Sequence, residues 1–596
     1  MKKVANRSEI SAEYKWDLSA IYKDDCAWES DFEALKTKLP EIKKFDGKLD
    51  SADNILACLK LSDELSMTAG ELYVYARQKQ DEDADNAVYQ AMCDRAEVLG
   101  VDLSEAMSFI SPQLAKLNND FLLSLAEKSE FLSYDYMLKE VVRGKEHTLS
   151  DAEEKIIAQA GLFSGGFHDA FNMFDSVDIK FKKVKDSDGD SVAMSHGNYA
   201  VLLQSKDRSV RRAAFNSMFG AYKDMINTIT QLYAGNIKKD LFYAKVRKYP
   251  NCLSRAVDGE NVPASVYETL VKCVDANVGQ LHNYMAFRAR KLGLKKLNMY
   301  DLHMPIFERK NKDVDYEDAK EIVLSALSVM GKEYIGVVKR AFDEKWIDVY
   351  ENKGKRSGAY SWGTYNSHPY MLLNYNGTMH DVFTLAHEMG HSMHSYYSDK
   401  AQPFAKAQYE IFVAEVASTV NEVLLLKYLL RNTEDKEEKK YLLSYYLDMF
   451  RTTLFRQTMF AEFEVKAHAL AESGKPVTKE ELCGIYYELN KKYYGDSVIS
   501  DDLIRYEWAR IPHFYRSFYV YKYATGIISA VSIASSILEK GDKAVAQYKK
   551  FLRAGGSMPP VEILKLAGVD LTTDAPYNTA MREFCDTLCN LTDLDR

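Results

Sequence analysis

Hydrophobic residues recur along most of the chain at the spacing of amphipathic helices. Runs such as Trp28 to Leu39 and Ala52 to Leu65 are separated by polar turns, a pattern typical of successive helical hairpins. A second helical stretch is predicted from Asp120 to about Phe171, and helices resume from Ser209 to about Leu292. With only 12 Pro and 29 Gly among 596 residues, the composition also favours helix. We therefore predict a mostly helical protein.

Three short stretches carry β signals instead. Residues Val177 to Val184 alternate with period two, and Asp188-Gly189 precedes Ser191 to Met194, so we predict a β-hairpin. Ile347 to Tyr350 and Pro369 to Tyr375 are further strand candidates, the second within a region rich in Gly, Ser and Asn. An exposed strand there could pair with an extended peptide through backbone hydrogen bonds, or it could belong to a small packing sheet.

The length of the chain predicts more than one lobe, because 596 residues exceed the usual size of a single domain. Breaks are favoured at Ser111-Pro112 and at Asn118-Asn119-Asp120, and the predicted hairpin ends near residue 195. We therefore divide the chain into an N-terminal helical region 1–118, a helical region 119–195 that ends in the hairpin, and a region 196–596.

Charge and composition narrow the possible partners and compartment. The formal net charge of -9 argues against nucleic acid or an anionic membrane as the main partner, and no obligate protein partner is evident. No stretch approaches 18 apolar residues and the N-terminus has no apolar signal region, so a cytoplasmic protein is expected. The eight cysteines lack paired metal spacing and are expected to be free thiols.

One copy of the pattern His-Glu-x-x-His, at residues 387–391, is the strongest chemical signal. In a helix, residues four apart lie on one face, so the imidazoles of His387 and His391 can converge on one metal ion, with Glu388 beside it. An apolar stripe on a different face supports the helix. A catalytic zinc needs three protein ligands and a position for water, so a third ligand must lie elsewhere. The alternative is a pair of buried, hydrogen-bonded core histidines.

The helix predicted from Tyr409 to Leu424 offers that third ligand. Glu415 and Glu422 lie seven residues apart, two turns along one face, among apolar residues. A buried carboxylate without a partner is costly, so a cation is expected nearby. We predict that Glu415 is the third ligand and that Glu422 orients a ligating histidine. Alternatively, both glutamates pair with Lys or Arg of a neighbouring helix.

A third cluster of chemical groups lies between Trp508 and Gly526. Four tyrosines, one His and one Arg fall within eleven residues of this stretch. Hydrolysis of an amide develops negative charge on the former carbonyl oxygen, which phenol or imidazole donors can stabilise. The alternative is a buried aromatic helix whose hydroxyls satisfy the backbone. His513, directly after Pro512, is the member that packing explains least.

Together these residues resemble the oligoendopeptidase F group of the thimet oligopeptidase family of zinc metallopeptidases. Besides the His-Glu-Met-Gly-His helix, the resemblance covers blocks in a shared order along nearly the whole chain: Trp16-Asp17-Leu18, Met299 to Leu302, Gly354 to Ser361, Phe412 to Thr419, Phe455 to Glu464, and Ile511 to Gly526. The resemblance implies a two-lobed, mostly helical body around a deep channel that admits short peptides. Region 119–195 then resembles the family's N-terminal region, and region 196–596 its catalytic domain.

The same resemblance assigns roles to individual residues. It implies one zinc ion per chain, with Glu388 as general base and Glu422 at the family's second acidic position. The implied zinc ligands are His387, His391 and Glu415. The implied donors to the substrate carbonyl are His513, Tyr519 and Tyr521.

We therefore expect a zinc-dependent endopeptidase that hydrolyses internal bonds of short oligopeptides. The alternatives are a zinc carboxypeptidase on a similar helical body and a non-catalytic peptide-binding protein with a structural zinc.

Overall fold

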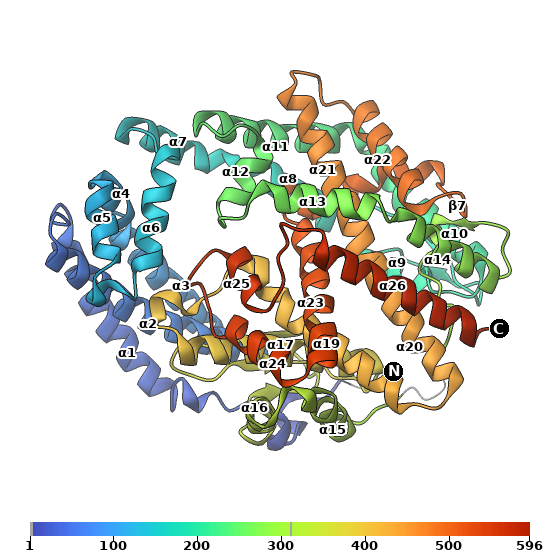
Figure 1. The fold of residues 1–596 in the computed structure, drawn as a ribbon, viewed down its shortest axis with the longest axis horizontal. Coiled ribbons are helices and arrows are strands. Elements are labelled where there is room, and N and C mark those ends of the chain that lie inside the picture. Colours follow the sequence, from blue (N-terminus) through green and yellow to red (C-terminus); the bar gives the residue numbers. More distant parts are fainter. Residues whose placement is uncertain (1–3, 310–312) are drawn as a thin grey trace. The chain divides into compact units, whose positions relative to one another are not determined.

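The computed structural model describes residues 4–309 and 313–596, and helices make up most of this chain (Figure 1). The described part divides into two compact units, each assembled from three segments. Unit 1 comprises residues 1–146, 311–428 and 533–569, and unit 2 comprises residues 147–310, 429–532 and 570–596. The mostly helical prediction is confirmed. The division into 1–118, 119–195 and 196–596 stays a prediction, because the compact units do not follow the chain in that order.

Unit 1 contains most of the N-terminal helices and the helix with the His-Glu-x-x-His pattern. Its helices are α1 (Asp25–Lys38), α2 (Ala52–Glu82), α3 (Ala87–Met107), α4 (Ile110–Lys116), α5 (Asn119–Ala126), α6 (Asp135–Gly144), α15 (Tyr316–Ala326), α16 (Lys332–Asp343), α17 (Met379–Ala401), α18 (Phe404–Ala407), α24 (Asp542–Leu552) and α25 (Pro560–Leu566). Two further helices contain a boundary between the units: α19 (Ile411–Asn432) and α23 (Tyr521–Lys540). Among all described residues, no helix is both long and apolar enough to cross a membrane.

Unit 2 contains the remaining helices. They are α7 (Asp151–Ser164), α8 (Gly166–Met173), α9 (His196–Leu202), α10 (Arg208–Asp224), α11 (Ile226–Val246), α12 (Cys252–Asp258), α13 (Ala264–Asp275), α14 (Val278–Lys291), α20 (Lys436–Met449), α21 (Arg456–Glu472), α22 (Lys479–Tyr494) and α26 (Ala575–Leu594). A parallel pair, β3 (Leu297–Asn298) and β7 (Val498–Ile499), joins two distant segments of this unit.

The predicted hairpin is present in unit 2, but it is shorter than expected. Its strands are β1 (Val184–Lys185) and β2 (Ser191–Val192), paired antiparallel. Val177 and Asp178 belong to a π-helical turn instead, and residues 179–183 form no strand. The pairing partner of β1 is short because α9 begins soon after β2, with Ser195 as its N-cap residue. A strand without a partner cannot satisfy its backbone, so the pairing stops after two residues.

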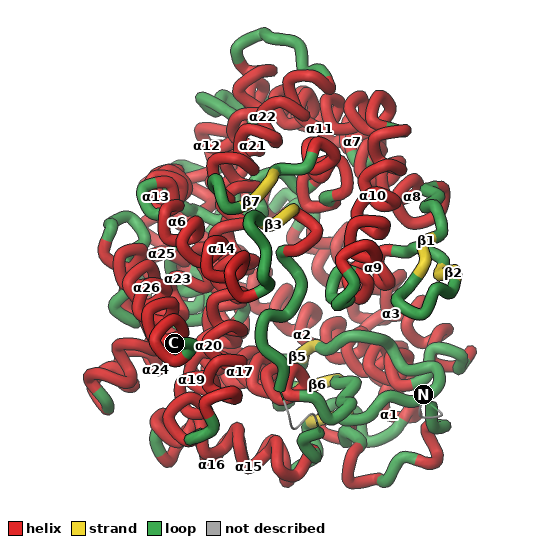
Figure 2. The backbone as a smooth tube through the Cα atoms, turned by 90° about the vertical axis from the view of Figure 1, so that its right-hand side faces the viewer, coloured by secondary structure: helices red, strands yellow, loops and turns green. Residues whose placement is uncertain are grey.

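A three-stranded sheet in unit 1 precedes the metal-motif helix. Its strands are β4 (Ile347–Asp348), β5 (Tyr360–Trp362) and β6 (Tyr370–Leu372), in the order β4-β6-β5. Figure 2 labels β5 and β6. Both strand candidates, Ile347 to Tyr350 and Pro369 to Tyr375, are therefore confirmed in part as β4 and β6. However, β6 is the central strand, parallel to β4 and antiparallel to β5. Because both its edges are paired, it cannot receive a peptide strand, and β5 is the edge strand beside it.

The N-terminal segment anchors this sheet. The backbone N–H of Val349 donates to the carbonyl of Tyr14 over 3.0 Å, and the Tyr370 hydroxyl donates to the carbonyl of Asp17 over 2.9 Å. The indole of Trp16 lies edge-on against Tyr370, with ring centroids 6.1 Å apart. Aromatic burial and backbone bonds thus hold residues 14–17 on the sheet, which in turn leads into α17.

Candidate metal centre

Helix α17 places the two histidines of the motif on one face. It starts with a capping box, in which the Thr378 hydroxyl accepts from the Asp381 backbone and the Asp381 carboxylate accepts from the Thr378 backbone. Val382, Ala386 and Met389 are completely buried on the packing side. The predicted helix is thus confirmed, and it extends to Ala401.

Gly390 sets the distance between α17 and α19. A Cβ atom at Gly390 would lie 2.5 Å from the carbonyl oxygen of Ala417 and 2.5 Å from Cα of Ser418. The two helices therefore contact each other through bare backbone at this point. The amide of Asn421 adds a hydrogen bond of 3.1 Å to the carbonyl of Ala386. This close approach brings the carboxylates of α19 within reach of the histidines.

We expect the substitution Gly390→Ala to lower the free energy of unfolding by about 1–3 kcal/mol, because the added methyl group overpacks the helix contact. It should also weaken metal binding, since α19 carries Glu415. Urea unfolding and metal titration measure the two effects. Gly336→Ala in α16 is the matched control, because a Cβ there meets nothing within 4 Å. If both variants unfold at the same urea concentration, the contact at Gly390 does not limit the helix approach.

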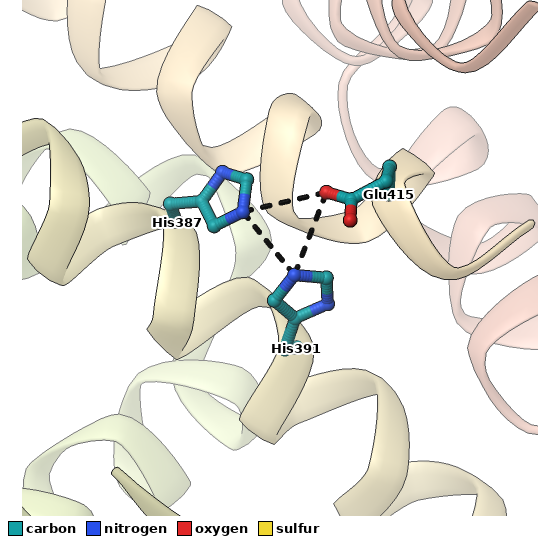
Figure 3. Close-up of side chains that lie close together, drawn as sticks. All are labelled: His387, His391 and Glu415. Carbon is teal, nitrogen blue, oxygen red and sulfur yellow. Dashed lines mark hydrogen bonds and ion pairs between the residues drawn. The ribbon is translucent and has the colours of Figure 1, made fainter. Parts of the chain in front are cut away.

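The side chains of His387, His391 and Glu415 point toward one another (Figure 3). Nε2 of His387 lies 3.2 Å from Nε2 of His391, and the Glu415 carboxylate oxygen Oε2 lies 3.4 Å and 3.6 Å from these two nitrogens. A tetrahedral zinc bound at about 2.0–2.1 Å separates its ligand atoms by about 3.3 Å. The donor set therefore fits a zinc ion, and the described residues contain this one group of three or more possible ligands.

Electrostatic interactions favour positive charge in this cluster. Burial opposes a charge on His387, but hydrogen bonds to Glu415 and Glu422 outweigh it and raise the pKa of His387 to about 10. Burial likewise opposes the Glu415 carboxylate, yet hydrogen bonds from His387 and His391 hold its pKa well below the ordinary value. Nδ1 of His387 donates to Glu422 over 2.6 Å, which leaves Nε2 facing Glu415. A metal cation bound here would replace the proton that these carboxylates attract.

Glu388 lies beside the cluster without belonging to it. Its side chain is buried, and the oxygen Oε2 has no hydrogen-bond partner among the described residues. Burial raises the pKa of Glu388, while the neighbouring His391 and His387 partly offset that rise. A buried carboxylate oxygen without a protein partner is costly unless another group binds it. The geometry therefore suits a carboxylate that receives a proton from a water molecule or a substrate.

The aromatic stretch near residue 513 lies in unit 2 and contains a local cluster around His513. Nε2 of His513 lies 3.4 Å from the hydroxyl of Tyr523, and its ring centroid lies 6.0 Å from that of Tyr519. Burial, and secondly Arg516, lower the pKa of His513, which favours the neutral imidazole. Tyr521 points elsewhere: it is 1% exposed and its ring packs on Tyr267 at 4.9 Å.

The structure thus groups Tyr519 and Tyr523, but not Tyr521, with His513. Tyr519 precedes α23 and Tyr523 lies in its first turn, so helical spacing alone does not predict which tyrosines lie near His513. Because the metal cluster belongs to unit 1, the role of His513, Tyr519 and Tyr521 toward a substrate stays a prediction.

Comparison with known proteins agrees with the site. Residues 201–583 match peptidase family M3, and residues 113–181 match the family Oligopeptidase F. The chain is 42% identical over 591 residues to Oligopeptidase PepF of Bacillus subtilis, covering 99% of this chain and 88% of that protein. Two crystal structures are also similar. One from Chlamydophila abortus has a TM-score of 0.94 at 38% identity, covering 99% of this chain and all of the other. Oligoendopeptidase-F from Enterococcus faecium has a TM-score of 0.74 at 35% identity, covering 96% and 99%. The chain therefore belongs to peptidase family M3, as a metalloendopeptidase.

Proposed function

We propose that the protein is a zinc-dependent endopeptidase that hydrolyses internal peptide bonds of short oligopeptides. The observation that carries the proposal is the triangle of ligand atoms from His387, His391 and Glu415, separated by 3.2 to 3.6 Å, beside the buried carboxylate of Glu388. The names of the relatives, Oligopeptidase PepF and oligoendopeptidase-F, support peptides as the substrates. Membership of a peptidase family argues against a non-catalytic peptide-binding protein.

The chain supplies three metal ligands, a residue that orients one of these ligands, and a general base. His387, His391 and Glu415 would hold zinc, which when bound lowers the pKa of a water molecule and polarises the scissile carbonyl. Glu422 fixes the ring of His387 through the hydrogen bond to Nδ1, so that Nε2 faces Glu415 and would be free to bind zinc. Glu388 takes the proton from the attacking water and delivers it to the leaving amine. The partnerless oxygen Oε2 is the atom suited to that transfer.

We further propose that His513 and tyrosines of the same stretch donate hydrogen bonds to the negatively charged oxygen that forms during hydrolysis. Tyr519 and Tyr521 are the phenols that the family resemblance assigns, and the contact of Tyr523 with His513 favours Tyr523 over the buried Tyr521. Removing one such donor is expected to lower kcat by about a hundredfold or more, with little change in KM.

Steady-state kinetics of His513→Ala, Tyr519→Phe and Tyr523→Phe would measure this loss, with Tyr521→Phe for comparison. Turnover within twofold of the wild type in all four variants would contradict a role for this cluster.

The proposed function is tested with purified protein and a mixture of peptides of about 5 to 30 residues, followed by mass spectrometry. We expect internal cleavage that a chelator abolishes and added zinc restores. Peptides with amidated C-termini serve as the control for the alternative of a zinc carboxypeptidase, which needs a free terminal carboxylate. Products that lack only C-terminal residues, and only from peptides with free C-termini, would favour that alternative.

A further inference from the structure

A cavity of unit 1 lies along the same helix as His387 and His391. It has a volume of about 600 Å³ and is lined by parts of α2, α17, the segment that contains β5, and residues 404–409, which include α18. Five aromatic side chains contribute to its wall: Tyr73, Trp362, Tyr365, Phe404 and Tyr409. One carboxylate, that of Asp399, also lines it, and none of the described residues around it is Lys or Arg.

Mutual contacts hold the aromatic walls in place. The rings of Tyr73 and Trp362 meet edge to face with centroids 5.6 Å apart, and those of Tyr365 and Phe404 do the same at 5.5 Å. The Tyr365 hydroxyl donates to the carbonyl of Gln402 over 2.9 Å. The Tyr409 hydroxyl lies 3.1 Å from that of Ser395 on α17. These contacts orient ring faces and edges that an incoming ligand can use without reorganising them.

Asp399 has no hydrogen bond or ion pair with any described residue, although it lies close enough to Tyr365 and Tyr409 to raise the pKa of both phenols, after the larger effect of their burial. Burial raises the pKa of Asp399 to about 7, and Lys400, its neighbour in sequence, only partly opposes this rise. A half-buried carboxylate without a partner is unfavourable, and a cation would relieve it. Aromatic faces add attraction for a cation.

The position of Asp399 relates this cavity to the metal centre. His391, Ser395 and Asp399 follow one another at intervals of four residues along α17, so they lie on one face. Asp399 is therefore about 12 Å beyond His391 along the helix axis. An extended peptide advances about 3.3 Å per residue, so this distance corresponds to about four residues. The hydroxyls of Ser361 and Ser392, 2.7 Å apart, tie β5 to α17 between the two places.

We propose that this cavity binds a positively charged group of a peptide substrate, three or four residues away from the scissile bond. The inference rests on the proposed endopeptidase function. An ammonium or guanidinium group would lie against the carboxylate of Asp399 and over the ring of Trp362 or Tyr409. The charged group can come from a Lys or Arg side chain or from the N-terminal ammonium of the peptide, and the test separates these two sources.

The test uses peptides of equal length in which one Lys is moved from position to position, each compared with a peptide that has norleucine there. We expect kcat/KM to be about tenfold higher for Lys at one position, about four residues from the cleaved bond. A second series compares free and acetylated N-termini. A preference for Lys identifies a side chain as the ligand, and a preference for the free terminus identifies the ammonium. Either preference should fall to within twofold in Asp399→Asn.

Controls separate this inference from the proposed function. Asp343→Asn removes an exposed carboxylate of α16 and should keep the full preference, whereas Trp362→Leu should reduce it. The affinity of the same peptides for the Glu388→Gln protein is measured by calorimetry, because binding does not require turnover. Binding to Glu388→Gln that prefers Lys, together with a zinc-loaded wild-type protein that cleaves no peptide, would refute the endopeptidase proposal and keep the cavity. No preference for the charged group, or an equal preference in Asp399→Asn, would overturn the cavity inference.

Discussion

Replacing Glu388 by Gln is expected to lower kcat by roughly a thousandfold while zinc remains bound. Gln has nearly the same shape as Glu, but its amide cannot accept the proton of the attacking water. His387, His391 and Glu415 are untouched, so the ligand atoms keep their separations of 3.2 to 3.6 Å. Turnover of a short peptide and metal content by atomic absorption, measured on the same preparation, check both halves of this expectation.

A matched control for this substitution is Glu321→Gln, which makes the same chemical change at an exposed position of α15. It should leave kcat and zinc content unchanged. Near-normal turnover by the Glu388→Gln protein with one zinc per chain would remove Glu388 from the role of general base. Loss of zinc would instead show that Glu388 contributes to metal binding.

Replacing Glu415 by Ala is expected to remove bound zinc and, with it, measurable peptide hydrolysis. Two histidines alone do not complete the three-ligand set of a catalytic zinc site. The histidines come from α17 and Glu415 comes from α19. Glu415 is the one carboxylate in the group of possible ligands among the described residues. Zinc titration against a competing chelator measures the affinity, and circular dichroism shows whether α17 and α19 stay folded.

The graded comparison for Glu415→Ala is Glu422→Gln. Glu422 accepts a hydrogen bond from Nδ1 of His387 and does not face the metal position, so its loss should weaken zinc affinity about 10- to 100-fold without abolishing binding. Activity at saturating zinc should then recover in Glu422→Gln but not in Glu415→Ala. Equal loss of affinity in both variants would contradict the distinction between ligand and orienting residue.

Much of the candidate metal centre could be predicted from the sequence because the relevant spacings are local to single helices. Residues four apart in a helix share a face, so the positions of His387 and His391 on one face follow from local spacing alone. Glu415 and Glu422 could be predicted as parts of the site for two reasons. Carboxylates in an apolar helix need a cation nearby, and the His-Glu-x-x-His motif supplies only two of the three ligands of a catalytic zinc. The structure brings Glu415 to both histidines and Glu422 to His387.

Other features could not be predicted because they depend on what packs against an element. The spacing of Tyr519, Tyr521 and Tyr523 does not reveal that Tyr521 packs on Tyr267 while Tyr523 contacts His513. Likewise, a strand pattern at residues 369–375 cannot say whether that strand is central or at an edge, because its partners β4 and β5 come from other segments.

By itself, the sequence determined the helical character of the protein, its His-Glu-x-x-His helix and the chemical identity of the candidate metal ligands, since periodicity and donor chemistry are properties of short segments. The tertiary structure decided how closely α17 and α19 approach, which depends on bare backbone contact at Gly390. It also placed the aromatic cavity around Asp399, whose walls come from two separate segments of unit 1, residues 66–74 and 361–409. Such contacts join residues far apart in the chain, and no local pattern encodes their distance.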